Sequence, residues 1–284
     1  MSLRWLLPLS LLMSGCSALS AFDAVVAKDK GSLLLARDLR YAPGRRGKLD
    51  VYAPRGTAAG ARLPIIVWLY GGSWNSGSKD GYAFAARALA VQGFLVAVPD
   101  YRLVPEVRFP GFLEDNAAAV HWLRGHAVEL GGDPDRIVLV GHSAGAYNAA
   151  MLSLDPQWLG ADRAAVKGFA GLAGPYDFLP LDHAVTEAAF AQAPDLPATQ
   201  PINFASPDDP PALLAAGGAD ELVLPANSVK LAMLLSEQGV AVRTRVYPKL
   251  GHVGLLTAFA RPFRRTAPVL ADVAAFARDV TRTD

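Results

Sequence analysis

Hydrophobic residues in this chain gather in short runs that alternate with longer stretches of helical character. The run 63–70 is continuously apolar, as a strand covered on both faces must be, and three similar runs follow at 94–99, 136–140 and 212–216. The helix-forming stretches are 81–92, 113–130, 144–154, 225–238 and 268–281. This alternation predicts an α/β fold with a mostly parallel central sheet and helices on both faces.

The segment ahead of the first apolar run predicts an antiparallel hairpin. Residues 37–42 and 48–53 alternate in polarity, and a Pro-Gly turn pair lies between them. This hairpin would stand at the N-terminal side of the sheet.

The remaining stretches suggest one folded domain. Residues 17–36 show no firm period, so we expect a tether or a loosely docked lead-in there. Residues 37–284 would form a single domain. Within it, about 175–211 is rich in Pro, Asp and Ala and lacks a strand-like run, which predicts a small insertion of loop and short helix over one end of the sheet.

Residues 1–16 have the layout of an export signal. A basic start precedes the apolar run 5–13, and small residues follow up to Cys16. The run is too short to span a bilayer, and the chain has no second apolar run of about 18 residues. The end of the segment resembles the lipobox of bacterial lipoproteins, although Met13 stands where leucine is usual. We expect a lipoprotein anchored through Cys16 and facing the periplasm; the alternatives are an ordinary signal peptide with a periplasmic or secreted product, and a retained anchor.

Composition narrows the class of protein. Of 284 residues, 52% are hydrophobic and 19% are charged, and 27 Lys and Arg against 26 Asp and Glu give a formal net charge of +1. Such a chain can bury a large core and offers no electrostatic reason to bind nucleic acid. The single cysteine, Cys16, excludes an internal disulfide and any multi-cysteine metal site. Oligomeric state has no signal in the sequence.

The strongest chemical signal is the motif Gly-His-Ser-Ala-Gly at 141–145, between a strand-like run and a helix-forming stretch. This motif indicates a nucleophilic serine when a strand precedes it and a helix follows it. The turn between them is so tight that only very small residues fit two positions to either side of the serine. The turn would lift Ser143 Oγ clear of the sheet and aim a helix N-terminus at it. Ser143 is the candidate nucleophile, with a purely structural turn as the alternative.

A serine hydroxyl needs a base to remove its proton at neutral pH, and the chain has five histidines. His252 is the candidate, because it follows the strand-like segment 241–247 in a loop at the carboxyl end of the sheet, where α/β sites are built. The other four have weaker placements: His121 and His126 within a predicted helix, His142 beside the serine but pointing elsewhere, and His183 in the insertion.

An acid that orients this histidine should follow a strand between the serine and the histidine in the chain. Asp220 does so, just past the run 212–216, and would hold His252 in the right tautomer and stabilise the imidazolium. Glu221 is adjacent but would project differently. The other competitors are Asp177, Asp208 and Asp209, of which the last two precede the strand.

The oxyanion of a tetrahedral intermediate requires convergent N–H donors. The run 63–70 ends in the segment 71–74, Gly-Gly-Ser-Trp, whose glycines let backbone amides approach a substrate oxygen closely. We expect the amides of Gly72, Ser73 and Ala144 to serve, with a plain glycine turn as the alternative.

Together these segments resemble the α/β-hydrolase esterases of the hormone-sensitive-lipase and feruloyl or acetylxylan esterase (BD-FAE-like) group. The likeness extends from about residue 48 to residue 276. Its motifs are YGGSW at 70–74, DYRLVPE at 100–106, FP at 109–110, LED at 113–115, GDPDRI at 132–137, GHSAG at 141–145, AD at 219–220 and GH at 251–252. The resemblance implies the α/β-hydrolase fold and carboxylic ester hydrolysis.

Two positions depart from the pattern of that group. Tyr70 stands where histidine is usual, and Ser73 stands where a third glycine is usual. The Ser73 amide can still donate, but loop support and pocket shape would differ. In such a family Arg102 and Asp115 tie a helix to a loop, so we assign them no catalytic role.

We therefore expect a serine hydrolase that cleaves small-molecule carboxylic esters through an acyl-enzyme, with no metal or organic cofactor. Ser143 would attack, His252 would move the proton and Asp220 would orient the histidine. An amide-type hydrolase, such as an arylformamidase or a peptidase, would use the same groups. A hydrolase-fold binding protein without turnover is the alternative from another class. The sequence leaves acyl and alcohol specificity open.

Overall fold

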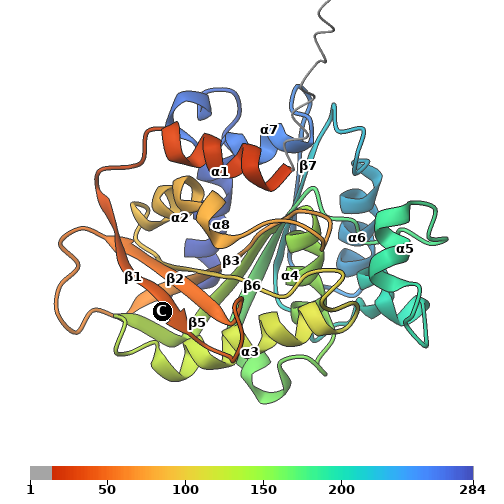
Figure 1. The fold of residues 1–284 in the computed structure, drawn as a ribbon, viewed down its shortest axis with the longest axis horizontal. Helices are drawn as coiled ribbons and strands as arrows, with labels where there is room; N and C mark the ends of the chain where they lie inside the picture. Colours follow the sequence, from red (N-terminus) through yellow and green to blue (C-terminus); the bar gives the residue numbers. More distant parts are fainter. Residues whose placement is uncertain (1–14, 284) are drawn as a thin grey trace, which may run out of the picture.

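The computed structural model describes residues 15–283, which form an eight-stranded sheet covered by helices (Figure 1). The strands are β1 Ser32–Arg40, β2 Lys48–Pro54, β3 Leu63–Leu69, β4 Leu95–Pro99, β5 Gly132–His142, β6 Val166–Leu172, β7 Ala212–Gly217 and β8 Val242–Tyr247. They lie in the order β1-β2-β4-β3-β5-β6-β7-β8. Strand β2 is antiparallel to both of its neighbours and all the other pairings are parallel, which confirms the predicted sheet and its N-terminal hairpin.

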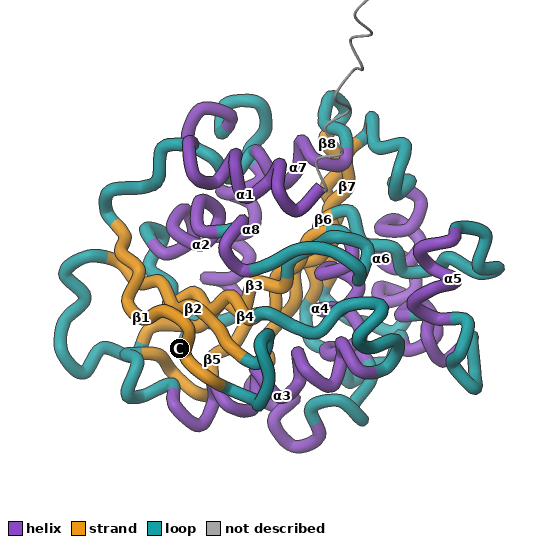
Figure 2. Tube along the Cα trace, in the orientation of Figure 1, coloured by secondary structure: helices purple, strands orange, loops and turns teal. Residues whose placement is uncertain are grey.

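Helices cover both faces of this sheet. They are α1 Gly15–Val25, α2 Ala83–Ala90, α3 Gly111–His126, α4 Ala144–Leu154, α5 Ala184–Phe190, α6 Ala226–Glu237, α7 His252–Thr257 and α8 Val269–Val280. Side chains alternate along each strand. In β3, Ile66 and Trp68 pack in the core that includes α2 and α8, whereas Ile65 and Val67 pack in the core that includes α3 and α6. Figure 2 shows α1 and α7 at the same edge of the molecule, beyond α2.

Strand β6 is the central element that the hydrophobic pattern did not predict. Its sequence contains Lys167 and two glycines, so no continuous apolar run marks it. A Cβ on Gly171 would lie 1.9 Å from the hydroxyl of Tyr176, and one on Gly168 would lie 2.9 Å from the ring of Phe276. Aromatic rings therefore occupy the space that branched side chains fill in the other strands.

Residues 17–36 differ from the expected tether or loosely docked lead-in. Helix α1 covers the first part of this stretch, and β1 begins at Ser32, five residues earlier than the hairpin that the sequence predicts. Phe22 packs against Phe84 of α2, with ring centroids 5.2 Å apart. Asp23 is buried, and its Oδ1 accepts the amide of Phe84 at 2.7 Å. The period is hard to recognise because this helix is only 11 residues long and its exposed side includes apolar residues such as Val25.

The segment 175–211 contains α5 and short turns of 3₁₀ helix, and an aromatic cluster holds it against the domain. Phe178 and Phe190 of this segment pack against Trp74 and Tyr147, with ring centroids 4.8 to 6.0 Å apart. The Tyr147 hydroxyl also donates to the carbonyl of Thr199 at 2.7 Å.

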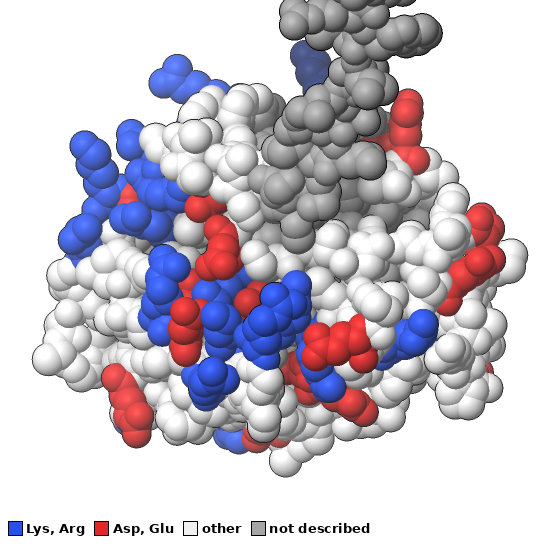
Figure 3. Space-filling view, viewed as in Figure 1, with Lys and Arg blue, Asp and Glu red and all other residues white. Residues whose placement is uncertain are grey.

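Basic and acidic side chains are interspersed on the face of the molecule seen in Figure 3. Lys48 pairs with Asp38 at 2.9 Å, and Arg37 lies 4.0 Å from Asp80. Opposite charges at such spacing largely cancel beyond about 10 Å in physiological salt. Among residues 15–283, no helix is both long enough and apolar enough to cross a bilayer. The expected export signal falls on residues 1–16, of which 1–14 lie outside the described residues.

Candidate active site

Strand β5 runs into α4 through a tight turn that carries Ser143. The serine has φ 56° and ψ −126°, a conformation that residues with a Cβ rarely adopt and that only a fixed surrounding sustains. A Cβ on Gly145 would lie 2.0 Å from the carbonyl oxygen of Leu69, and one on Gly141 would lie 2.1 Å from that of Gly145. Glycine is therefore required on both sides of the serine.

Main-chain contacts also fix Ser143 against the neighbouring strands. Its amide donates to the carbonyl of Leu172, the last residue of β6, at 2.9 Å. A Cβ on Gly71, which follows β3, would lie 2.9 Å from the Cβ of Ser143. The serine thus stands where the carboxyl ends of three adjacent parallel strands meet, which is where sites in open α/β sheets are built.

His252 is the first residue of α7, and Asp220 just past β7 fixes its ring. The Nδ1 atom of His252 lies 2.8 Å from Asp220 Oδ2. The other carboxylate oxygen, Oδ1, accepts the amides of Leu222 and Val223 at 2.9 Å each. A buried carboxylate held in this way keeps the proton of a neutral imidazole on Nδ1 and leaves Nε2 available as a base.

His142 packs against the same histidine. The two ring centroids are 4.7 Å apart, and His142 Nε2 lies 2.9 Å from the carbonyl oxygen of His252. Burial, with the nearby His252 as a second cause, lowers the pKa of His142 to about 3. The neutral ring therefore donates its Nε2–H to the backbone of His252. This contact could not be predicted from the sequence, because the two residues are 110 positions apart.

The loop after β3 holds two of the three expected oxyanion donors. Gly72 has φ 128°, and the next two residues, Ser73 and Trp74, have φ 52° and 57°. The carbonyl of Gly72 accepts the amides of Asn75 and Ser76 at 3.1 and 2.9 Å, so the loop turns back on itself. Gly72 and Ser73 line the same cavity as Ser143. Ala144, the third expected donor, is buried at the start of α4, where an amide has no partner within its own helix.

A cavity of about 530 Å³ brings these groups together. Ser143, His142 and His252 form part of its wall, and none of the described residues that line it is an Asp, Glu, Lys or Arg. The rest of the wall comes from the loop after β3, Tyr82, Leu222, α7 and one face of α1. The α1 residues in the wall are Ala18, Leu19, Ser20 and Phe22. Sequence reasoning missed this contribution because it treated these positions as a lead-in.

The aromatic residues near the motifs pack outside this cavity. Trp74 is 3% exposed and Tyr147 is fully buried, and neither of them lines the cavity, nor does Phe178. Trp74 Nε1 donates to Asn148 Oδ1 at 3.2 Å. These rings hold the segment 175–211 in place rather than contact a substrate.

The other candidate side chains have structural partners. Arg102 donates to both oxygens of Asp115, and its amide donates to Oδ2 of the same carboxylate at 2.7 Å, as expected for a helix-to-loop tie. Four of the competing acids and histidines have partners away from this site. Asp177 pairs with Lys230, Asp209 with Arg163 and His121 with Asp162, and His126 contacts the carbonyl of Trp122. Within residues 15–283, no three His, Cys, Asp or Glu side chains gather as metal ligands would.

Known proteins resemble this chain in both sequence and structure. Among curated proteins, Esterase LipQ of Mycobacterium tuberculosis is 30% identical over 225 residues, which are 72% of this chain and 53% of that protein. Carboxylesterase NlhH of the same organism is 44% identical over 93 residues, which are 32% of this chain and 29% of that protein. The chain thus spans about half or less of the length of these relatives.

Solved structures agree on the fold. Esterase B from Lactobacillus rhamnosis, inhibited by a tributyrin phosphonate, matches with a TM-score of 0.81 at 19% identity, over 93% of this chain and 91% of that one. A truncated carbohydrate esterase from gut microbiota matches with a TM-score of 0.73 at 22% identity, over 89% of this chain and 99% of that one. These likenesses establish the α/β-hydrolase fold.

The family model named BD-FAE matches residues 49–235, a stretch that begins in β2 and ends in α6. It includes the loop after β3, the turn at Ser143 and Asp220, and it covers well over half of the chain. This protein belongs to the BD-FAE family.

Proposed function

We propose that this protein is a serine hydrolase that cleaves uncharged carboxylic esters through an acyl-enzyme. One observation carries the proposal: Ser143 stands on a strained turn in the cavity that it shares with His252, whose ring is bonded to Asp220 through Nδ1. A histidine held in this way has its Nε2 free to accept the serine proton. Relatives named as esterases support the reaction class.

In the proposed reaction Ser143 Oγ attacks the ester carbonyl while His252 Nε2 takes its proton. The amides of Gly72, Ser73 and Ala144 would stabilise the oxyanion, a contribution often worth about 3 kcal/mol per donor. His252 then gives the proton to the leaving alcohol, which leaves an acyl group on Ser143. A water molecule, deprotonated by His252, attacks the acyl-enzyme; His252 then returns that proton to Ser143 Oγ as the bond to the acyl group breaks and the acid leaves.

The character of the cavity supports a neutral substrate. Among residues 15–283, its wall holds no Asp, Glu, Lys or Arg and includes Leu19, Phe22, Leu256 and Leu222. An anionic substrate would lose its hydration there without gaining a counter-ion. Neutral esters with apolar acyl or alcohol groups would instead bury apolar surface, which contributes about 25 cal/mol per Å².

Hydrolysis of 4-nitrophenyl butyrate by the full-length protein tests the reaction. We expect turnover in the wild type and a loss of at least a thousandfold in kcat for Ser143→Ala. Ser153→Ala is the matched control, because Ser153 lies on the same helix, is buried and has an unbonded hydroxyl among the described residues. No turnover in the wild type, or full activity in Ser143→Ala, would refute the proposal. A parallel assay with butyryl 4-nitroanilide decides between ester and amide cleavage.

We further propose that the protein is exported and anchored by a lipid on Cys16. The layout of residues 1–16 supports this proposal. Fractionation of cells that produce the wild type and Cys16→Ser is the test. The wild type should remain with the membrane and carry a lipid mass on its N-terminal peptide, whereas the variant should lose that mass. An unmodified Cys16 in the membrane fraction would contradict it.

A further inference from the structure

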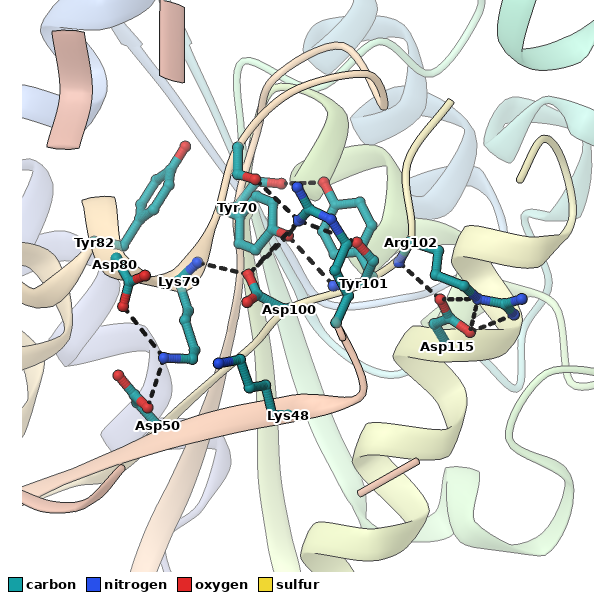
Figure 4. Close-up of polar contacts among 12 residues, drawn as sticks. Lys48, Asp50, Tyr70, Lys79, Asp80, Tyr82, Asp100, Tyr101, Arg102 and Asp115 are labelled. Atoms are coloured by element: carbon teal, nitrogen blue, oxygen red, sulfur yellow. Dashed lines mark hydrogen bonds and ion pairs between the residues drawn. The ribbon is translucent and has the colours of Figure 1, made fainter. Parts of the chain in front are cut away.

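A buried polar cluster lies behind the loop that carries the expected oxyanion donors (Figure 4). We call Arg46, Tyr70, Asp100 and Tyr101 the Tyr70 cluster. Arg46 comes from the turn between β1 and β2, Tyr70 directly follows β3, and Asp100 and Tyr101 directly follow β4. Tyr70 and Tyr101 are fully buried, and Asp100 is 5% exposed.

The hydroxyl of Tyr70 is the central atom of this cluster. It donates to Asp100 Oδ1 at 3.1 Å and accepts hydrogen bonds from Arg46 Nη1 at 3.1 Å and from the amide of Tyr101 at 3.3 Å. The ring of Tyr70 is stacked between those of Tyr101 and Tyr82, with centroids 4.5 and 5.5 Å away. One phenol therefore joins a cation from the turn between β1 and β2 to a carboxylate and a backbone amide from the segment after β4.

We call the segment 70–79, which carries Gly72 and Ser73, the oxyanion loop. The same groups form hydrogen bonds at both of its ends. At its start, the Tyr101 hydroxyl donates to the carbonyl of Tyr70 at 2.7 Å. At its end, Arg46 Nη1 donates to the carbonyl of Gly77 at 3.1 Å, and the amide of Lys79 donates to Asp100 Oδ1 at 2.8 Å. Gly72 and Ser73 lie between these two attachment points.

The loop needs such support because its backbone is strained. Ser73 and Trp74 both have positive φ without being glycine, a backbone conformation that persists only where the surroundings enforce it. Burial raises the pKa of Tyr70 well above its ordinary value, so the phenol stays protonated and can donate. Burial also raises the pKa of Asp100, and the Lys79 amide, Arg46 and the Tyr70 hydroxyl each oppose that rise.

We propose that Tyr70 is a positioning residue that, by linking Arg46 to Asp100, holds the Gly72 and Ser73 amides where the oxyanion forms. This inference rests on the proposed ester hydrolysis. Oxyanion donors act on charge that develops only in the transition state, so their misplacement should lower kcat and leave KM nearly unchanged.

The test is Tyr70→Phe in the full-length protein, which removes one oxygen and keeps the stacked ring. With 4-nitrophenyl acetate we expect kcat to fall about tenfold to a hundredfold and KM to change less than threefold. The acidic limb of the pH profile should keep its midpoint, because the pair of His252 and Asp220 is untouched. Tyr247→Phe is the matched control, since its hydroxyl also donates to an aspartate, Asp272, at 2.7 Å, away from the loop.

Arg46→Lys provides a second variant that does not depend on the tolerance of the buried tyrosine. Its side chain is 18% exposed, and a single atom, Nη1, donates to both Tyr70 and Gly77. The lysine side chain is shorter and lacks the planar guanidinium, so its ammonium should not occupy the position of Nη1. It should lower kcat by about tenfold with KM unchanged. Combined with Tyr70→Phe it should cost less than the sum of the two, because both act through one network. Losses that add fully, fall equally on KM, or stay within twofold in folded variants would overturn the inference.

Labelling of Ser143 by a 4-nitrophenyl alkylphosphonate separates this inference from the proposed function. The Oγ–P bond forms, the P–O bond to nitrophenolate breaks, and the serine proton passes to His252. The phosphoryl oxygen needs the same amides, so the labelling rate of Tyr70→Phe should fall with its kcat. A wild type that is labelled but does not turn over esters would refute the proposed function, and the labelling rates would still test Tyr70. A wild type that is not labelled would refute both.

Discussion

His142 is held neutral by burial against His252, and this makes the stability of the protein sensitive to acid. Its pKa is about 3 in the folded protein against an ordinary value near 6.5, so the unfolded chain binds more protons between these values. Stability is therefore fully present above about pH 6.5 and is lost as the pH falls toward 3.

Replacement of His142 by glutamine should remove this acid sensitivity while keeping an N–H donor near the carbonyl of His252. Between pH 7 and pH 5, the wild type should lose about 2 kcal/mol more unfolding free energy than His142→Gln. Urea unfolding at the two pH values measures the difference. His183→Gln is the control, because that side chain is 77% exposed. The same pH dependence in His142→Gln as in the wild type would contradict the prediction.

At the scale of elements, α1 acts as a cap for another helix. Helix α2 has no side-chain hydrogen bond at its own N-cap, Tyr82, and Asp23 of α1 accepts the amide of Phe84 in its first turn. Asp23 also pairs with Lys28 at 3.2 Å. These contacts fasten α1 across the cavity.

Asp23→Ala should therefore destabilise both helices. We expect a loss of about 1 kcal/mol in unfolding free energy, as for other lost caps, and faster proteolysis between α1 and β1. Asp23→Asn should retain most of the stability because it keeps an acceptor oxygen. Thermal unfolding and limited proteolysis measure the two effects, with exposed Asp195→Ala as the control. An unchanged protease sensitivity would show that α1 does not depend on this contact.

The helices and strands also show which parts of the fold could be predicted from the sequence and which could not. Apolar runs in the sequence predict strands β3, β4, β5 and β7, and a local motif predicts the turn at Ser143. Strand β6 has no such run, because its glycines make room for the ring of Tyr176 and for that of Phe276, which lies far along the chain in α8. The Tyr70 cluster could not be predicted from the sequence either. Tyr70 is recognisable as a departure from the family pattern, but its partner Arg46, 24 positions away, belongs to no motif.

At the scale of the whole molecule, the cavity is closed by segments from opposite ends of the chain. Helix α1 lies near the amino end and α7 near the carboxyl end, yet Leu19 and Leu256 line the same space. The volume available to a substrate therefore depends on how α1 docks.

Leu19→Trp should restrict the accepted esters to those with short acyl chains. The larger ring would occupy part of the cavity of about 530 Å³, so kcat/KM for 4-nitrophenyl octanoate should fall at least tenfold more than that for 4-nitrophenyl acetate. Val25→Trp is the control, because Val25 lies on the same helix and is 84% exposed. An equal loss for both esters would mean that Leu19 supports the fold without limiting substrate size.

The glycines around Ser143 cannot be replaced by larger residues, whereas side chains in the cavity wall can be. Main-chain atoms of β3, β5 and α4 touch directly at Gly71, Gly141 and Gly145, so no substitution there can be absorbed by a side-chain rotation. Part of the cavity wall, by contrast, consists of side chains on α1 and of side chains on α7 that follow His252, such as Leu19 and Leu256. New substrates could thus be acquired by changing those side chains alone, while Ser143, His252 and Asp220 keep their places.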